Sequence, residues 1–134
     1  MKNSIYTFLL LAVTSFTFAQ SNYQLSSHIL DISKGMPATG VTIKLEKLQK
    51  DKVSWNIVDQ KTTDNAGRVG NFLPADKSNA GIYRLTFLIQ DYFKQSNTES
   101  FYPFIEVVFE IKDEKHYHVP ITLSAFGYST YRGN

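Results

Sequence analysis

The chain has 134 residues, of which 43% are hydrophobic and 14% aromatic, and its formal net charge is +2. This length suits one domain with a single hydrophobic core. The balanced charge does not indicate a nucleic-acid binder, and the lack of cysteine excludes disulfides, thiolate nucleophiles and cysteine metal sites.

The beginning of the chain, MKNSIYTFLLLAVTSFTFA, has the three-part layout of a secretory signal peptide. Lys2 supplies the positive charge, residues 5–13 are mostly apolar, and small residues precede Gln20. A membrane anchor is the competing interpretation, but the apolar run is shorter than the ~20 residues that span a bilayer. We therefore expect residues 1–19 to be removed and residues 20–134 to form one domain, exported to the periplasm or secreted, without a membrane anchor.

The remaining chain predicts strands separated by turns. Apolar and polar residues alternate, as is typical of half-buried strands, in 41–48, 83–89 and 106–112, and less clearly in 55–63. Residues 90–98 are expected to contain a short helix. Seven or eight strands in about 115 residues predict an all-β sandwich. The positions expected to face the core are Val41, Ile43, Leu45, Tyr83, Leu85, Phe87, Ile89, Val107, Phe109 and Ile111.

Two of the three histidines lie one residue apart in HYHVPITL, which we expect to be a strand. Alternation turns Tyr117 and its period-2 partners toward the core, and turns His116 and His118 to the opposite face. The two histidines are then either solvated surface residues or two ligands of a metal ion such as zinc, with His28 as the third ligand. Arg68 follows the turn DNAG, where arginines are mostly solvated, so residue types alone name no site.

Two longer stretches resemble one known family. LSSHILDISKGMPATGV is similar to the N-terminal signature of the 5-hydroxyisourate hydrolases, also called transthyretin-related proteins. HYHVPITLSAFGYSTYRGN is similar to their C-terminal signature, which ends in Tyr-Arg-Gly-Ser, and the turn DNAGRV falls in register between the two. Transthyretins share much of LSAFGYST but differ at the two histidine positions and the arginine position and lack the final tetrapeptide. The resemblance therefore favours the hydrolases over the transthyretins, which are hormone carriers.

The resemblance implies two groups of site residues. The catalytic group is His28, Arg68 and His118, and the substrate-binding group is Tyr131, Arg132, Gly133 and Asn134. The chain departs from the family at its last residue, where asparagine stands in place of serine. Asparagine forms hydrogen bonds but is no nucleophile, which disfavours a covalent role and leaves the positioning of substrate or water open.

The resemblance also implies the architecture and the reaction. The family fold is a transthyretin-like β-sandwich of two four-stranded sheets with one short helix, assembled as a homotetramer, a dimer of dimers, with active sites in the channel between dimers. The family reaction is the hydrolysis of 5-hydroxyisourate to 2-oxo-4-hydroxy-4-carboxy-5-ureidoimidazoline in urate degradation, without a cofactor.

Such a hydrolysis needs a general base and a group that stabilises charge on the carbonyl oxygen. Imidazole, with an ordinary pKa of about 6.5, suits the first task, and His28 and His118 are equal candidates for it. Arg68 is expected to stabilise the oxyanion and Arg132 to bind the substrate.

Two other classes of function stay open. A non-catalytic small-molecule binding protein would use the same channel without turnover, because a fold does not determine a function. A zinc-dependent protein would use His28, His116 and His118. If the protein is instead a cofactor-free hydrolase, His116 is expected to be dispensable and activity to survive chelators.

Overall fold

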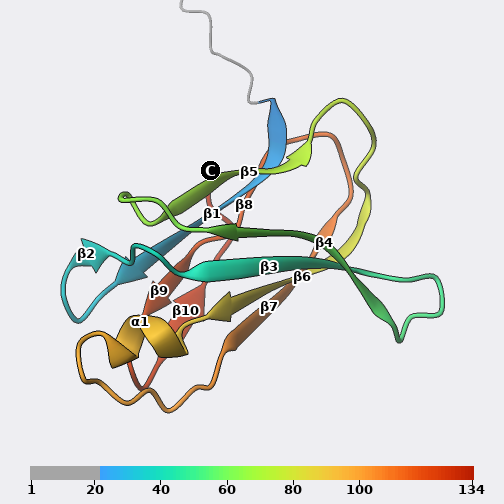
Figure 1. The fold of residues 1–134 in the computed structure, drawn as a ribbon. Coiled ribbons are helices and arrows are strands. Elements are labelled where there is room, and N and C mark those ends of the chain that lie inside the picture. Colours follow the sequence, from blue (N-terminus) through green and yellow to red (C-terminus); the bar gives the residue numbers. More distant parts are fainter. Residues whose placement is uncertain (1–21) are drawn as a thin grey trace, which may run out of the picture.

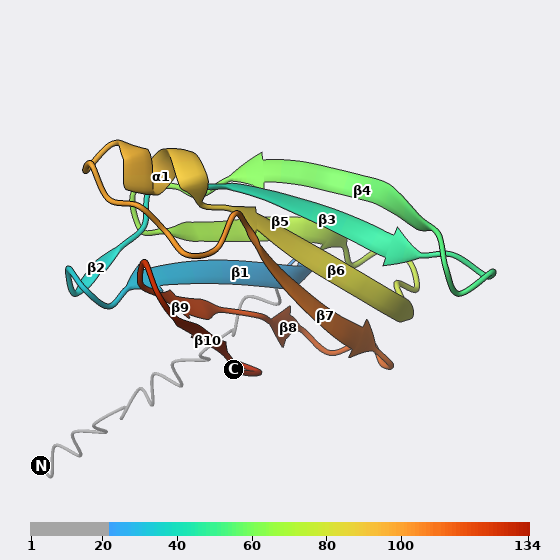
Figure 2. The ribbon, with the colours of Figure 1, turned by 90° about the horizontal axis from the view of Figure 1, so that it is seen from below.

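The structure is a computed structural model and describes residues 22–134. The predicted signal peptide and its cleavage site lie outside the described residues. Within those residues, no helix is long and apolar enough to cross a membrane. Two sheets face each other as layers, and the short helix α1 (Gln90–Lys94) lies at one end of the sandwich (Figures 1 and 2).

One sheet has four antiparallel strands in the order β4-β3-β6-β7. Its strands are β3 (Thr42–Leu48), β4 (Trp55–Thr62), β6 (Gly81–Leu88) and β7 (Ile105–Ile111). The predicted alternation of 55–63 is weak because β4 is an edge strand whose register shifts opposite Leu45 and Glu46, and most of its side chains are exposed. β7 forms the other edge of this sheet.

The second sheet is built around β1 and has six strands. They are β1 (Tyr23–Asp31), β2 (Met36–Pro37), β5 (Arg68–Pro74), β8 (Tyr117–His118), β9 (Ile121–Leu123) and β10 (Tyr128–Thr130). β5 runs antiparallel to β1 on one side, while β8 and β9 run parallel to it on the other. β10 pairs with β9 and forms an edge.

The two-layer all-β sandwich is confirmed, and the second sheet has six strands where four are expected. β8 and β9 are two halves of the strand predicted from HYHVPITL, separated by Val119 and Pro120. Proline has no N–H to donate to a ladder, which explains a break at this point. The sixth strand, β2, contains only two residues and pairs with the end of β1.

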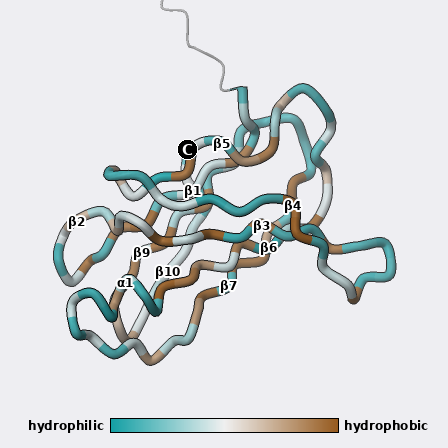
Figure 3. The backbone as a smooth tube through the Cα atoms, viewed as in Figure 1, coloured by the Kyte–Doolittle hydropathy of each residue, from teal (hydrophilic) through white to brown (hydrophobic). Residues whose placement is uncertain are grey.

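The core lies between the two sheets and contains the residues predicted to face inward. All of them are at most 8% exposed except Phe109, which is half-buried against the core. Tyr117, Val119, Ile121 and Leu123 are also buried, as predicted. Figure 3 shows hydrophilic residues in several connecting loops and along β4. The outer faces of the sheets carry polar side chains such as Ser26 and His28, together with exposed apolar ones such as Val108.

The helix α1 ends at Lys94, four residues before the end of the predicted segment. Asn97 adopts a left-handed conformation with φ of 50°, and the N–H groups of Ser96 and Thr98 both donate to the carbonyl of Phe93. A left-handed residue stops a helix, and asparagine adopts this conformation more readily than most residues. The Tyr92 hydroxyl donates to Asp31 at 2.7 Å and so ties the helix to the end of β1.

Candidate active site

The outer face of the β1 sheet brings together three residues that are far apart in the sequence. In β1, Leu25, Ser27 and Ile29 are buried, whereas Ser26 and His28 face outward. His28 pairs with Arg68 of β5, and Ser26 pairs with His118 of β8. Because paired residues project from the same face of a sheet, the three predicted catalytic side chains occupy neighbouring positions on three adjacent strands. Figure 1 shows β5, β1 and β8 side by side.

A tight turn before β5 sets the position of Arg68. The Asp64 side chain accepts hydrogen bonds from the N–H groups of Ala66 and Arg68, both at 2.9 Å. Gly67 has φ of +70°, and a Cβ atom there would lie 2.7 Å from the Ile29 carbonyl oxygen. The carbonyl of Gly67 in turn accepts from Ile29 N–H at 2.9 Å, which holds the turn beside His28. Glycine is needed here both for its left-handed backbone and for the close approach.

The side chain of Ser26 lies between the two histidines of the His-x-His motif. Its hydroxyl oxygen is 2.8 Å from His116 Nε2 and 2.8 Å from His118 Nδ1. His116 Nδ1 lies 3.0 Å from the carbonyl oxygen of Tyr23. Sequence reasoning missed Ser26, because the parallel pairing of two segments 92 residues apart leaves no mark on local periodicity. The available signal was its place two residues before His28, on the same strand face.

The C-terminal tail is tied to His118. Gly133 N–H donates to the carbonyl of His118 at 2.9 Å, and the two residues form an antiparallel bridge. A Cβ atom on Gly133 would overlap His118 Cδ2 and lie 3.1 Å from Cγ. Gly133 therefore packs closely against the His118 imidazole. Asn134 follows directly and is exposed.

Arg132 and Tyr131 lie apart from the histidines in the single chain. The Arg132 guanidinium stacks over the ring of Tyr117, 4.4 Å from its centroid. Both tail residues line a hollow of about 440 Å³ between the edge strand β7 and the tail. Of the seven predicted site residues, the structure thus brings together His28, Arg68, His118 and Gly133, and the substrate-binding role of Arg132 stays a prediction.

Burial and neighbouring positive charge keep both site histidines neutral. Burial lowers the pKa of His118, and Arg68, His28 and His116 lower it further, against the opposing effect of the Ser26 main chain. Burial and Arg68 also lower the pKa of His28, against the opposing effects of the Ala66 carbonyl and Asp64. At neutral pH both imidazoles can therefore accept a proton, as a general base must.

The geometry gives no support to the zinc alternative. Among residues 22–134, no three histidine, aspartate or glutamate side chains are grouped so that they could hold a metal ion. His116 and His118 direct ring nitrogens to the Ser26 hydroxyl instead.

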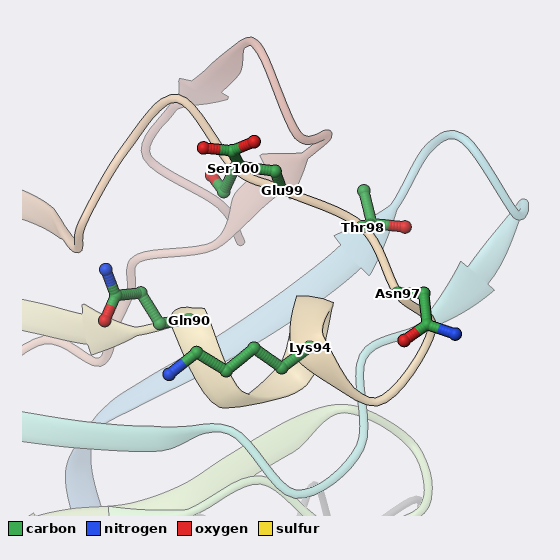
Figure 4. Close-up of a pocket in the computed structure, with 6 residues that line it drawn as sticks. All are labelled: Gln90, Lys94, Asn97, Thr98, Glu99 and Ser100. Atoms are coloured by element: carbon green, nitrogen blue, oxygen red, sulfur yellow. The ribbon is translucent and has the colours of Figure 1, made fainter.

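A second hollow lies beside α1, at the end of the sandwich (Figure 4). It is lined only by polar or charged residues, namely Gln90, Lys94, Asn97, Thr98, Glu99 and Ser100. None of these six residues belongs to the predicted site or forms a hydrogen bond with a predicted site residue. The outer face of the β1 sheet is thus the better candidate for chemistry.

Residues 25–133 match the model of the HIUase/Transthyretin family. The chain belongs to this family. A probable 5-hydroxyisourate hydrolase of Caenorhabditis elegans is 43% identical over 98% of this chain and 99% of its own length. The 5-hydroxyisourate hydrolase of Mus musculus is 37% identical over 87% of this chain and 99% of its own length.

Two solved structures show how the family divides. The 5-hydroxyisourate hydrolase of Klebsiella pneumoniae has a TM-score of 0.71 and 36% identity, covering 82% of this chain and 98% of that one. Sea bream transthyretin in complex with thyroxine has a TM-score of 0.77 and 30% identity, covering 82% of this chain and 94% of that one. The fold is therefore common to both branches of the family, and the site residues must distinguish them.

Proposed function

We propose that this protein hydrolyses 5-hydroxyisourate to 2-oxo-4-hydroxy-4-carboxy-5-ureidoimidazoline in urate degradation. The observation that carries the proposal is the meeting of His28, Arg68 and His118 on three adjacent strands of one sheet face. The hydrolase names of the relatives from worm and mouse support the same activity.

The residues on this face can perform each step of a hydrolysis. A neutral histidine takes a proton from water, whose oxygen attacks the acyl carbon of the substrate ring. Negative charge develops on the carbonyl oxygen, and the Arg68 guanidinium is the cation placed to stabilise it. The ring C–N bond then breaks, the nitrogen takes a proton from the imidazolium, and the new carboxylic acid loses its proton to solvent to become a carboxylate. These steps call for no group beyond the protein side chains and water.

The C-terminal tail provides the substrate-binding part of the proposed site. The bond from Gly133 to His118 holds Asn134 near the catalytic face, where its amide can orient substrate or water. Tyr131 and Arg132 line the adjoining hollow. The planar guanidinium of Arg132 can donate two parallel hydrogen bonds to the imide-like edges of the substrate.

The protein is proposed to act as a homotetramer, a dimer of dimers, with the catalytic face lining the channel between dimers. β7 and β10 each lie at an edge of their sheet, and exposed Val108, Tyr128 and Tyr131 lie on or beside them. Edge strands with apolar side chains tend to pair with another chain.

The protein is also proposed to be exported, to the periplasm or beyond, after cleavage before Gln20. The support is the signal-peptide layout of residues 1–19. Intact-mass measurement of the secreted material tests this, and recovery of the full-length chain in the membrane fraction would contradict it.

Spectrophotometry with freshly generated 5-hydroxyisourate tests the activity. His28→Ala and His118→Ala should each lower kcat/KM by about 10²–10⁴-fold, because general acid–base groups contribute that much. The circular dichroism of both variants should match the parent protein. Wild-type protein that binds the substrate without accelerating its decay would contradict the proposal.

A non-catalytic binding protein is the second candidate, supported by the likeness to sea bream transthyretin and by Asn134. The hydrolytic activity of the Asn134→Ser variant distinguishes the hydrolase from the binding protein. A hydrolase in which Asn134 positions substrate or water should change in activity by no more than roughly tenfold, about 1.4 kcal/mol in the barrier. A much larger gain would mean that the natural chain is a crippled enzyme and would favour the binding protein.

A further inference from the structure

We propose that Ser26 and His116 are positioning residues that fix the tautomer of His118, so that His118 presents an unprotonated Nε2 to the reacting water. The catalytic part of this inference rests on the proposed hydrolysis, whereas the tautomer itself can be measured without any reaction. It gives His116 a role, where the sequence predicts a dispensable side chain.

The chain of hydrogen bonds begins at the main-chain carbonyl of Tyr23. A carbonyl oxygen only accepts, so His116 Nδ1, 3.0 Å away, carries the proton in this contact. A neutral imidazole has one N–H. The Nε2 atom of neutral His116 is therefore an acceptor.

The Ser26 hydroxyl links the protonation of His116 to that of His118, because the role of donor or acceptor that it takes toward one ring determines its role toward the other. It has one proton, and it donates that proton to His116 Nε2 at 2.8 Å. Its oxygen can then only accept from His118 Nδ1, which lies 2.8 Å away on the other side. His118 Nδ1 is thus the protonated nitrogen, and the lone pair of Nε2 stays available.

The unprotonated nitrogen, Nε2, lies next to the ring atom that the C-terminal tail approaches. Nε2 is bonded to Cδ2, the atom against which Gly133 packs. The half-buried ring is held from both sides, by Ser26 through Nδ1 and by Gly133 at Cδ2. A base whose lone pair is aimed by a partner on its other nitrogen needs little reorganisation as the proton moves.

Nitrogen-15 NMR of the imidazole rings at about pH 8, where an ordinary histidine is neutral, tests the tautomer directly. With signals assigned by His28→Gln and His116→Gln, we expect Nδ1 of His118 to be protonated and Nε2 to be bare. The reverse tautomer in the wild-type protein would overturn the proposal.

Ser26→Thr and Ser26→Val form a matched pair, because the two side chains have similar shapes and only threonine keeps the hydroxyl. Both are β-branched and suit a strand. The threonine variant should keep the wild-type tautomer and kcat. The valine variant should shift His118 toward the Nε2–H form and lower kcat by at least about tenfold with little change in KM. Equal tautomers and equal kcat in the two variants would overturn the proposal.

His116→Ala provides a second test at an exposed position where folding is not at risk. Without its acceptor, the Ser26 proton can turn to His118 Nδ1, so both tautomers should be populated and kcat should fall. An unchanged tautomer would contradict the role of His116. If the wild-type protein shows the expected tautomer but hydrolyses no 5-hydroxyisourate, the proposed function fails and the hydrogen-bond chain stands.

Discussion

The neutral state of His28 and His118 is set by their surroundings. Burial is the first cause of their lowered pKa values, and Arg68 is the second. Because the base must be unprotonated, a lowered pKa keeps the site active at a pH where a free histidine would already be charged.

The pH profile should show this effect. As pH falls, kcat/KM should drop with a midpoint below the ordinary histidine value of 6.5. Arg68→Ala removes a cation that opposes protonation, so the midpoint of the residual activity should move to higher pH, although burial remains. Lys44→Ala, on the other sheet, is the control and should leave the midpoint in place. An Arg68→Ala profile with an unmoved midpoint would contradict this account.

Gly133→Ala should impair catalysis more than stability. The new Cβ atom would overlap His118 Cδ2, so the ring or the tail must move, and a 1 Å misplacement of a catalytic group can lower rates by up to about 100-fold. The tail is largely exposed, so Tm should barely change. Gly70→Ala is the control, because no atom lies within 4 Å of its added Cβ. Equal kcat/KM values for the two variants would show that Gly133 does not hold the site.

The pairing of β1 with β5 and β8 is the element-scale basis of the site. β1 contributes its outer face to both neighbours, so a shift of either register by one residue would turn the partner side chain to the other face. The turn from Asp64 to Gly67 sets the β5 register, because it places Arg68 opposite His28.

Gly67→Ala and Gly35→Ala should separate backbone strain from crowding in that turn. Both glycines have left-handed φ values, so each alanine costs about 1–2 kcal/mol of unfolding free energy. Only at Gly67 does the Cβ also meet the Ile29 carbonyl and Pro37, which should destabilise by roughly 1–3 kcal/mol more. Urea unfolding measures the difference, and equal losses would contradict it.

At the scale of the whole molecule, β7 is one edge of the four-stranded sheet and β10 is one edge of the six-stranded sheet, and the hollow lined by Tyr131 and Arg132 lies beside β7. In the proposed tetramer, a second copy would pair at these edges and enclose the hollow. The catalytic face and the assembly contacts would then be joined through the same C-terminal tail.

Val108→Lys should weaken the assembly, because it puts a charge on the edge strand β7, where Val108 is 58% exposed. Val53→Lys is the matched control, since Val53 is 77% exposed in the turn between β3 and β4. Light scattering after size exclusion should report a smaller particle for the first variant only. A wild-type monomer would contradict the tetramer itself.

The sequence by itself determined the local structure and the orientation of the side chains. Period-2 alternation assigned the core positions from Val41 to Leu123 and turned His116 and His118 outward, because a strand's side-chain direction depends only on the parity of the position. The turn DNAGRV, with its glycine and aspartate, marked the place where β5 begins. The family motifs indicated that His28, Arg68 and His118 form the catalytic group.

Only the tertiary structure decided which side chains meet. The parallel pairing that sets Ser26 against His118, and through it links His116 to the site, depends on contacts across about two thirds of the chain that local periodicity cannot encode. The same holds for Arg132, whose side chain stacks on Tyr117 instead of joining the histidines. Strand direction is a local property, whereas strand partners are chosen by packing of the whole sandwich.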